Sequence, residues 1–147
     1  MIRKMTQKDL TEVLKIENES FVNGRYSLTQ FKDEFKNPFA TLIVSENNKD
    51  IDGFLIYMIT FNSATIVQIA VDSNKREKGI GSELLNHMFK HFESLGYGKI
   101  ETVTLEVRKQ NDVAHKFYLK NGFKDVVTKK EYYTNGDDAI YMQRILL

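Results

Sequence analysis

The chain has 147 residues, of which 41% are hydrophobic and 28% charged, and its formal net charge is +1. These values are ordinary for a globular protein of about one domain, so we expect a single domain over residues 1–147. The near-neutral charge argues against wholesale binding of nucleic acid or membrane, because those partners usually need a strongly basic surface. The absence of cysteine excludes disulfides, thiolate catalysis and cysteine metal ligands, and it fits a reducing cytosol.

The start of the chain, MIRKMTQKDL, becomes polar too soon for a signal peptide. No uninterrupted apolar run approaches the roughly 20 residues that cross a bilayer. We therefore expect a soluble, cytoplasmic protein that is a monomer or a weak homodimer.

Two short helices and an antiparallel meander are expected in the first half of the chain. The first helix, from about residue 9 to 16, has apolar residues at helical spacing and a cap at Thr6. The second follows a capping-box pattern at Ser27 and stops before Pro38. The stretches ATLIVSE, FLIYMI and ATIVQIAV are then typical of three strands joined by tight connections.

The second half predicts two more helices and three more strands. A long helix with an apolar face from Leu84 to Phe92 ends at Gly96, and the alternation in TVTLEV indicates a strand over 102–107. A helix over about 112–120 and two strands around VVT and AIYMQRI, joined across TNGDD, complete the chain. Because a crossover helix links them, the strand ending at Val71 and the strand over 102–107 should run parallel. The predicted fold class is therefore α/β or α+β, with about four helices around one mixed, mostly antiparallel sheet.

The stretch REKGIG, residues 76–81, places two glycines directly before the long helix. A helix N-terminus has backbone N–H groups without internal partners and carries about half a positive charge, so it attracts anions. Glycine lets a phosphate approach the backbone, and Arg76 and Lys78 add positive charge. A tight turn before the helix is the alternative explanation. The Walker pattern GxxxxGK[ST] is absent, and Leu84 stands where the dinucleotide fingerprint GxGxxG needs its third small residue.

The stretch QIAVD, followed by RxxGxG, resembles the acetyl-coenzyme A signature [RQ]xxGx[GA] of the GCN5-related N-acetyltransferases. LEVRKQNDVAHKFYLKNGF resembles the later signature of the RimI-type subgroup of this family, whose activity is acetylation of the N-terminal alanine of a ribosomal protein. EYYTNGDDAIYM and IENESFVNGRYSLTQF are similar to further parts of that subgroup, so the resemblance spans most of the chain.

The resemblance implies a sheet splayed into a V between the two parallel strands, acetyl-coenzyme A as the acetyl donor, and a protein or peptide N-terminus as the partner. The family's pantetheine arm lies on backbone that matches residues 69–71, and its pyrophosphate lies on amides that match residues 77–82. Asn111 would also contact the cofactor, and a role as helix N-cap is the structural alternative. The residues assigned to the cofactor are Ile69, Ala70, Val71, Arg76, Glu77, Lys78, Gly79, Ile80, Gly81, Ser82, Asn111 and Tyr118.

Acetyl transfer to an amine needs a neutral amine, a stabilised oxyanion and a proton for the departing thiolate. At pH 7 an α-amine with a pKa near 7.7 costs about 1 kcal/mol to deprotonate and a lysine near 10.4 about 4.6 kcal/mol, so an N-terminal amine is the easier acceptor. Glu106, on the polar face of its strand, matches the subgroup's catalytic base, and burial or a water relay would have to help so weak a base. Tyr118 matches the general acid that protonates the thiolate, although a core aromatic beside Phe117 is the alternative. A backbone N–H near Val71 should stabilise the oxyanion.

On the acceptor side, we expect contacts from Tyr26, Tyr132 and Tyr133. The subgroup often has proline and tryptophan where this chain has Val22 and Tyr26, so the resemblance is weaker there. Tyr132 and Tyr133 should begin a strand and point to opposite faces. The charged run over residues 129–131 is most simply a solvated edge of the sheet.

The remaining candidates are weaker. His87 and His91 are four residues apart on one helix, but HMFKH lacks the glutamate of HExxH, so we expect solvated histidines and no metal site. Two alternatives to N-terminal acetylation stay open: the same fold acetylating a small amine or a lysine side chain, and a module that binds acyl-coenzyme A without turnover.

Overall fold

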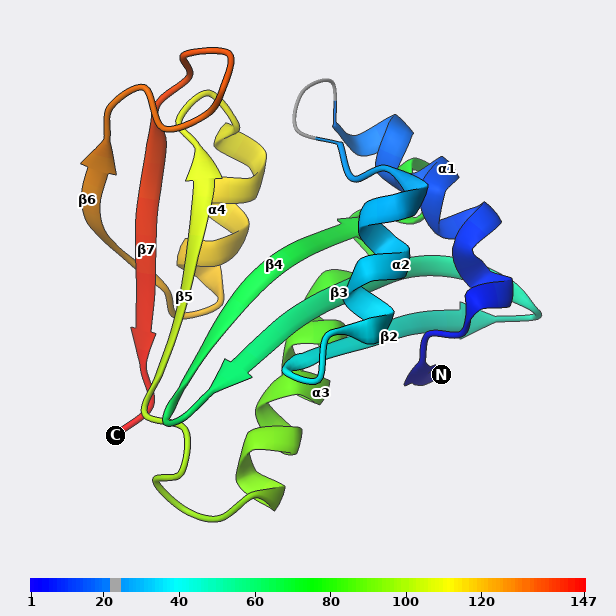
Figure 1. The fold of residues 1–147 in the computed structure, drawn as a ribbon, viewed down its shortest axis with the longest axis horizontal. Helices are drawn as coiled ribbons and strands as arrows, with labels where there is room; N and C mark the ends of the chain where they lie inside the picture. Colours follow the sequence, from blue (N-terminus) through cyan, green and yellow to red (C-terminus); the bar gives the residue numbers. More distant parts are fainter. Residues whose placement is uncertain (22–24) are drawn as a thin grey trace.

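The computed structural model describes residues 1–21 and 25–147. It has one seven-stranded sheet in the order β1-β2-β3-β4-β5-β7-β6 (Figure 1). The strands are β1 Ile2–Lys4, β2 Ala40–Asn47, β3 Asp50–Thr60, β4 Ser63–Val71, β5 Thr102–Arg108, β6 Lys124–Lys129 and β7 Ala139–Ile145. The helices are α1 Leu10–Ser20, α2 Leu28–Lys36, α3 Ile80–Ser94 and α4 Asp112–Lys120, with short 3-10 turns η1 Gln7–Asp9 and η2 Ser73–Lys75. None of the helices in these two ranges is long and apolar enough to span a membrane.

Apart from β1, the order of elements that the sequence predicts is confirmed, and both predicted capping boxes are present. The Thr6 N–H donates to Asp9 Oδ2 at 2.7 Å ahead of α1, and the Ser27 N–H donates to Gln30 Oε1 at 2.8 Å ahead of α2. Such side-chain acceptors satisfy N–H groups that have no partner inside the helix. Gly96 takes a φ of +116° after α3, as a left-handed helix end requires.

Strand β3 begins earlier than expected, because Gly53 continues the strand instead of interrupting it. A Cβ atom on Gly53 would lie 2.9 Å from the carbonyl oxygen of Ala70 on β4, closer than a side chain allows. The glycine is therefore explained by the close approach of two backbones within the sheet.

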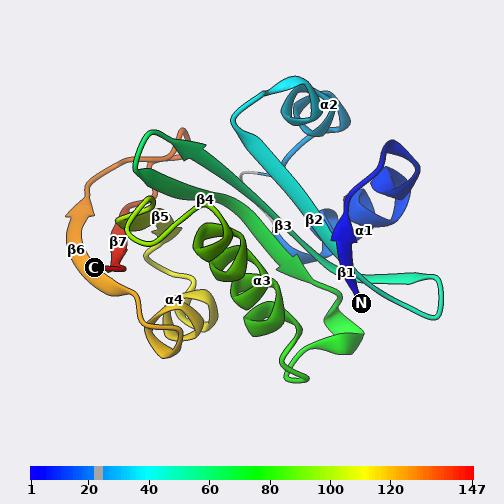
Figure 2. The ribbon, with the colours of Figure 1, turned by 90° about the horizontal axis from the view of Figure 1, so that it is seen from below.

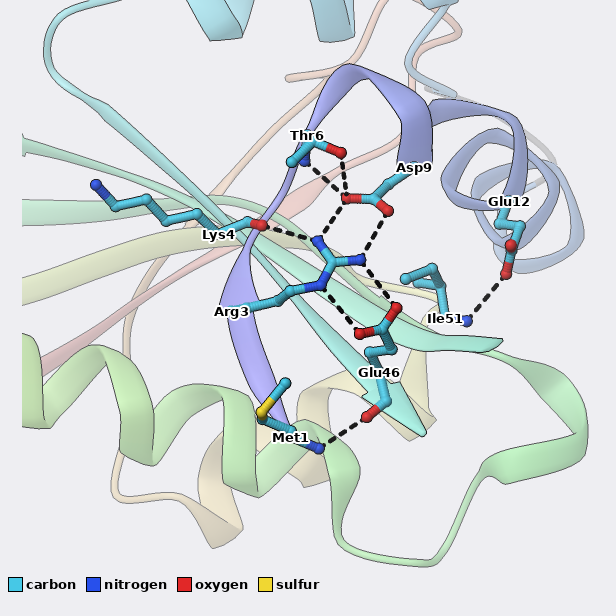
Figure 3. A network of polar contacts seen from close by, with 8 residues as sticks. All are labelled: Met1, Arg3, Lys4, Thr6, Asp9, Glu12, Glu46 and Ile51. Atoms are coloured by element: carbon cyan, nitrogen blue, oxygen red, sulfur yellow. Dashed lines mark hydrogen bonds and ion pairs between the residues drawn. The ribbon is translucent and has the colours of Figure 1, made fainter. Parts of the chain in front are cut away.

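Strand β1 was not predicted, and contacts from distant parts of the chain hold it in place. The Arg3 guanidinium lies between two carboxylates, donating to Asp9 Oδ1 and Oδ2 at 2.9 Å each and to Glu46 at 3.1 to 3.2 Å (Figure 3). The Met1 ammonium donates to the backbone oxygen of Glu46, and Glu12 accepts from the Ile51 N–H. A strand of three residues has too short a pattern to be recognised, and it pairs with β2, where Glu46 accepts from both Met1 and Arg3.

The two faces of the sheet are covered by different helices, α1 and α2 on one and α3 and α4 on the other (Figure 2). Along β2 and β3 the side chains alternate between the faces, as a two-residue period requires. The core of the α3/α4 face includes Leu84, Leu85, Met88, Phe92, Val103, Leu105, Val107, Tyr118 and Phe123. The core of the α1/α2 face includes Leu10, Val13, Ile16, Phe31, Leu42, Val44, Phe54, Ile56 and Ala70.

The parallel pair predicted between β4 and β5 is present but short. The two strands pair over residues 63–65 and 102–104 and then diverge, so the sheet splays into a V (Figure 1). Just beyond the last pair, the β3–β4 register shifts and leaves Val67 as an extra residue on β4. Such a bulge bends and twists its strand, which turns β4 away from β5. We call the diverging segments, residues 66–71 of β4 and 105–108 of β5, the fork.

Candidate active site at the fork

The loop before α3 presents bare backbone at the helix N-terminus. Gly79 is the N-cap with a φ of +82°, and a Cβ atom there would meet nothing within 4 Å. The N–H groups of Ile80, Gly81 and Ser82 have no partner within the described residues, whereas the Glu83 N–H already donates to the Gly79 oxygen at 2.9 Å. Glycine is needed at position 79 for its left-handed backbone, and these free donors can bind an anion.

The second glycine of REKGIG has a different structural reason. A Cβ atom on Gly81 would lie 3.0 Å from two ring carbons of Phe117 on α4. Glycine at this position therefore lets α4 pack closely against the first turn of α3. The approach of a phosphate, which we expected both glycines to permit, does not explain this contact.

The two basic side chains of the loop differ in their surroundings. Arg76 donates from Nε to the Val71 oxygen and from a terminal nitrogen to Ser20 Oγ, both at 3.3 Å, so it ties the end of β4 to the end of α1. Lys78 and Ile80 line a hollow of about 370 Å³ beside the start of α3. The carboxylates of Asp52 and Glu83 line the same hollow, so its charge is mixed.

The residues of β4 expected to hold the pantetheine arm line one side of the fork. Ile69 and Val71 pack against the α3/α4 core and Ala70 belongs to the α1/α2 core, while their backbone pairs with β3 on one edge and is unpaired toward β5. An extended amide-bearing chain can therefore bind along this edge in the manner of an added strand. Together with the amides at α3, these residues fit a ligand that has a diphosphate at one end and an extended arm at the other.

Asn111 is the N-cap of α4, and its Oδ1 accepts from the Ala114 N–H at 3.1 Å. This geometry confirms the structural alternative given for Asn111 above, and a contact with the cofactor stays a prediction.

Glu106 lies on the face of β5 opposite the apolar residues Leu105 and Val107, so its side chain is on the α1/α2 side of the sheet. Its Oε1 accepts a hydrogen bond from Lys129 Nζ at 2.9 Å. The side chains are 25% exposed for Glu106 and 37% for Lys129, so solvent reaches the pair. The bond to Glu106 raises the pKa of Lys129 above its ordinary value of 10.5.

The pairing of Lys129 corrects our expectation of a solvated edge over residues 129–131. The other two residues behave as expected, because Lys130 is 75% exposed while it contacts Asp138 and Glu131 is exposed. Lys129 and Glu106 are 23 positions apart in the sequence, and no local pattern connects them.

Tyr118 lies on α4 within the α3/α4 core, with 7% of its surface exposed. Its ring makes edge contacts with Phe117 and Phe123, at centroid distances of 5.3 and 5.7 Å. Burial raises the pKa of its phenol above the ordinary value of 10.0, so the hydroxyl keeps its proton at neutral pH. Glu106 and Tyr118 therefore reach the fork from opposite faces of the sheet.

Two of the three tyrosines expected on the acceptor side lie in a different element from the one predicted. Tyr132 and Tyr133 do not begin a strand: they lie in the loop between β6 and β7, with their rings in edge contact at 5.0 Å. The Arg108 guanidinium lies 3.8 Å from the ring centroid of Tyr133 and pairs with Asp137, which fixes this loop at the end of β5. Residues 130–138, which end with TNGDD, therefore form the loop between β6 and β7.

Tyr26 is half-buried beside Phe31, and burial raises the pKa of its phenol to about 12. The position of Val22 lies outside the described residues.

Glu17 was missed in the sequence and is fully buried between α1 and β4. Its Oε2 accepts from the Tyr26 N–H at 2.7 Å and from Gln68 Nε2 at 2.6 Å, and Oε1 is the one fully buried side-chain oxygen or nitrogen without a partner in the described residues. Burial raises the pKa of this carboxyl. Its position in the sequence could have indicated this burial, because Glu17 comes four residues after Val13 and so lies on the apolar face of its helix.

Of the two histidines set aside above, His87 is exposed as expected. His91 is half-buried, and its Nδ1 lies 2.6 Å from the Tyr57 hydroxyl. Burial lowers the pKa of His91.

A sheet that forks between two parallel strands, with a glycine-capped helix beside the fork, places this protein in the class of coenzyme A dependent acetyltransferases. Residues 9–123 match the model of the acetyltransferase (GNAT) family, and the chain therefore belongs to that family. It is an N-acetyltransferase that uses acetyl-coenzyme A.

Three known proteins illustrate the similarity. An uncharacterised N-acetyltransferase of Methanocaldococcus jannaschii is 30% identical, over 97% of this chain and 89% of the relative. An N-α-acetyltransferase of Sulfurisphaera tokodaii is 29% identical, over 96% and 90%. The crystal structure of the ribosomal-protein-S18-alanine N-acetyltransferase from Escherichia coli has a TM-score of 0.85 and 28% identity, and the match covers 99% of this chain and 93% of that one. The GNAT-like fold expected from the resemblance is thereby confirmed.

Proposed function

We propose that the protein acetylates the α-amine of a protein N-terminus, with a ribosomal protein beginning in alanine as the first candidate, by direct attack in a ternary complex. Two of the similar proteins are named for N-terminal acetylation, one as an N-α-acetyltransferase and one as acting on an alanine of ribosomal protein S18. These names support the substrate class.

The observation that carries the proposal is the placement of Glu106 and Tyr118 on opposite faces of the sheet at the fork. Placed on opposite faces, they can serve an amine that arrives from the α1/α2 side and a leaving group that departs on the α3/α4 side. Glu106 takes the proton from the amine, directly or through water, and Tyr118 gives its own proton to the leaving group.

Acetyl-coenzyme A supplies an acetyl thioester whose carbonyl carbon accepts the amine. The free amides of residues 80–82 bind its diphosphate at the start of α3, and the unpaired edge of β4 aligns its extended arm. A backbone N–H near Val71 stabilises the negative oxygen that develops on the carbonyl. The buried phenol of Tyr118 remains protonated and ready to donate, because its pKa is raised.

The acceptor side favours a primary amine. Glu106 is partly exposed and provides negative charge, and the loop residues Tyr132 and Tyr133 provide aromatic surface nearby. An α-amine costs about 3.6 kcal/mol less to deprotonate at pH 7 than a lysine side chain does, which favours an N-terminus for so weak a base. Tyr26, on the α1/α2 face, would line the approach of the following residues.

Initial-rate kinetics of coenzyme A release test the proposal, with acetyl-coenzyme A and the acceptor both varied. The acceptors are a peptide beginning in alanine, an N-blocked peptide with one lysine, and spermidine. We expect turnover with the first peptide and intersecting reciprocal plots, the pattern of a ternary complex. Turnover restricted to spermidine or to the lysine peptide would contradict the substrate class, and parallel plots would contradict direct attack.

A further inference from the structure

Three side chains on the outer part of the sheet form a small cage around the ammonium group of Lys129. Lys129 Nζ lies 2.9 Å from Glu106 Oε1, 4.6 Å from the ring centroid of Tyr141 and 5.1 Å from that of Tyr132. Glu106 and Tyr141 are direct cross-strand partners on β5 and β7, and Lys129 is the last residue of β6. We call Glu106, Tyr132 and Tyr141 the ammonium cage.

The chemistry of the cage is that of a receptor for a primary ammonium. The carboxylate gives a charge-assisted hydrogen bond, and the two aromatic faces attract a cation through their electron density. Both Glu106 and Lys129 are partly exposed, so an ammonium from solvent can reach the same atoms. The group that now fills the cage belongs to the chain itself.

The proposed base is thus engaged by Lys129 in the absence of acceptor. The bond takes up Oε1 of Glu106, and an incoming ammonium would meet a like charge at close range. Lys129 lies on the edge strand β6, where it pairs with Ala139, and its side chain reaches across the sheet to Glu106 and Tyr141. The ammonium can therefore leave the cage by side-chain rotation while the backbone stays in place.

We propose that the ammonium cage receives the α-ammonium of the acceptor and that Lys129 occupies it until the acceptor arrives. This inference rests on the proposed function. The acceptor's ammonium displaces Lys129 and donates its hydrogen bond to Glu106. One N–H bond then breaks, its proton passes to the Glu106 carboxylate, and the nitrogen keeps its electron pair as a neutral amine for the attack.

A permanent role for Lys129 in orienting Glu106 predicts the opposite effect of its removal. If Lys129 only competes for the cage, a variant without its charge binds acceptor more tightly. If Lys129 holds Glu106 in its working position, the same variant binds acceptor no better and turns over more slowly. The sign of the change in acceptor KM therefore separates the two roles.

The first test compares Lys129→Met, Lys129→Arg and Lys130→Met in kinetics with a peptide beginning in alanine. Lys130→Met removes a neighbouring charge that lies outside the cage. We expect Lys129→Met to lower the acceptor KM by about two- to fivefold, the range for loss of a partly exposed ion pair, with an unchanged KM for acetyl-coenzyme A. Lys130→Met should resemble the wild type, and Lys129→Arg, which keeps a positive charge in the cage, should not lower the acceptor KM. An acceptor KM that is unchanged or raised in Lys129→Met would overturn the inference.

The second test needs no turnover. Protein with ¹⁵N-labelled lysine is titrated with methylammonium chloride, and sodium chloride at the same concentration serves as the control. We expect the Lys129 ammonium signal to shift with methylammonium only, while the Lys130 signal responds equally to both salts. Equal responses at Lys129 would overturn the cage. Failure of the proposed function has a different signature, because acetylation of the alanine peptide would then be absent from every variant.

Discussion

Glu106 and Tyr118 approach the fork from opposite faces of the same sheet, the first from β5 on the α1/α2 side and the second from α4 on the α3/α4 side. This placement supports the proposal that Glu106 acts as the base and Tyr118 as the acid. We expect Glu106→Gln and Tyr118→Phe each to lower kcat by about tenfold or more, the usual size of a general acid or base contribution.

The two variants should differ in a second property. Glu106→Gln should also change the dependence of kcat/KM on the pKa of the acceptor amine, because the base no longer removes its proton. Tyr118→Phe should leave that dependence unchanged. Steady-state kinetics with peptides whose α-amines differ in pKa measure this, and circular dichroism checks that both variants fold. Rates equal to the wild type in both variants would remove the proposed acid and base while leaving the cofactor site in place.

The contact between Gly81 and Phe117 predicts a stability effect that depends on the ring. A methyl group at position 81 would be 3.0 Å from the ring, so Gly81→Ala should destabilise the fold by about 1–3 kcal/mol through overpacking. In a Phe117→Leu background the same substitution should cost clearly less. Denaturant unfolding of the two single variants and the double variant measures the coupling, and additive costs would show that the contact is unimportant.

Gly79 has free space around it and should respond to substitution for a backbone reason. Gly79→Ala should cost about 1–2 kcal/mol because φ is +82° there. It should also raise the KM for acetyl-coenzyme A by several fold, since the cap orients the free amides of α3. Gly136, with a φ of +87° and equally free surroundings in the loop before β7, is the matched control. Gly136→Ala should show a similar stability cost without the change in that KM.

The buried carboxyl of Glu17 predicts a stability difference that depends on pH. Burial raises its pKa in the folded state above the ordinary value of 4.5, so the folded protein binds its proton more tightly than the unfolded chain does. Below about pH 4.5 this favours folding, and the contribution is lost as the pH rises through the folded pKa. Glu17→Gln retains an oxygen that can accept from Tyr26 and Gln68 and has no charge to desolvate.

Glu17→Gln should therefore gain stability relative to the wild type as the pH rises from about 4 to about 8. Thermal unfolding of both proteins at several pH values measures this difference. A difference in Tm that stays constant across the range would contradict the buried charge. Glu17→Ala serves as the comparison, because it leaves both donors without an acceptor and should destabilise at every pH by about 1–3 kcal/mol.

The pairing of Arg3 with Asp9 predicts acid sensitivity of the N-terminal region. The hydrogen bonds from Arg3 lower the pKa of Asp9 below its ordinary value of 3.8. The stabilisation is thus present above that value and is lost as the pH falls through the folded pKa. Asp9→Asn should cost about 1–3 kcal/mol at neutral pH, the range for bonds to charged groups, and nearly nothing at about pH 2. Denaturant unfolding at the two pH values tests this, and an equal cost at both would contradict it.

The parts of the fold that local physical chemistry dictates could be predicted from the sequence. Capping residues and helical spacing define α1, α2 and α4 within a few residues, and alternation defines β5. Strand β1 could not be predicted, because it pairs with β2 and its Arg3 bonds to Glu46, 43 positions away. The fork followed only from the family resemblance, since nothing local marks Val67 as the bulge that turns β4 away from β5.

The candidate site divides in the same way. The cofactor side is a contiguous loop and helix start, which a motif over residues 76–82 can identify. The acceptor side is assembled from α1, β5, β6, β7 and two loops, so the Lys129–Glu106 pair and the buried Glu17 had no contiguous signal. Tyr132 and Tyr133 were assigned to a strand because their residue types favour one, while the salt bridge of Arg108 with Asp137 keeps that segment as a loop.

One measurement tests the proposed activity most directly. A peptide that begins in alanine and contains a single internal lysine is incubated with the wild-type protein and acetyl-coenzyme A, and tandem mass spectrometry locates the added acetyl group. We predict one acetyl group, on the α-nitrogen of the alanine. An acetyl group on the lysine Nζ, or an unmodified peptide in a preparation that acetylates small amines, would contradict it.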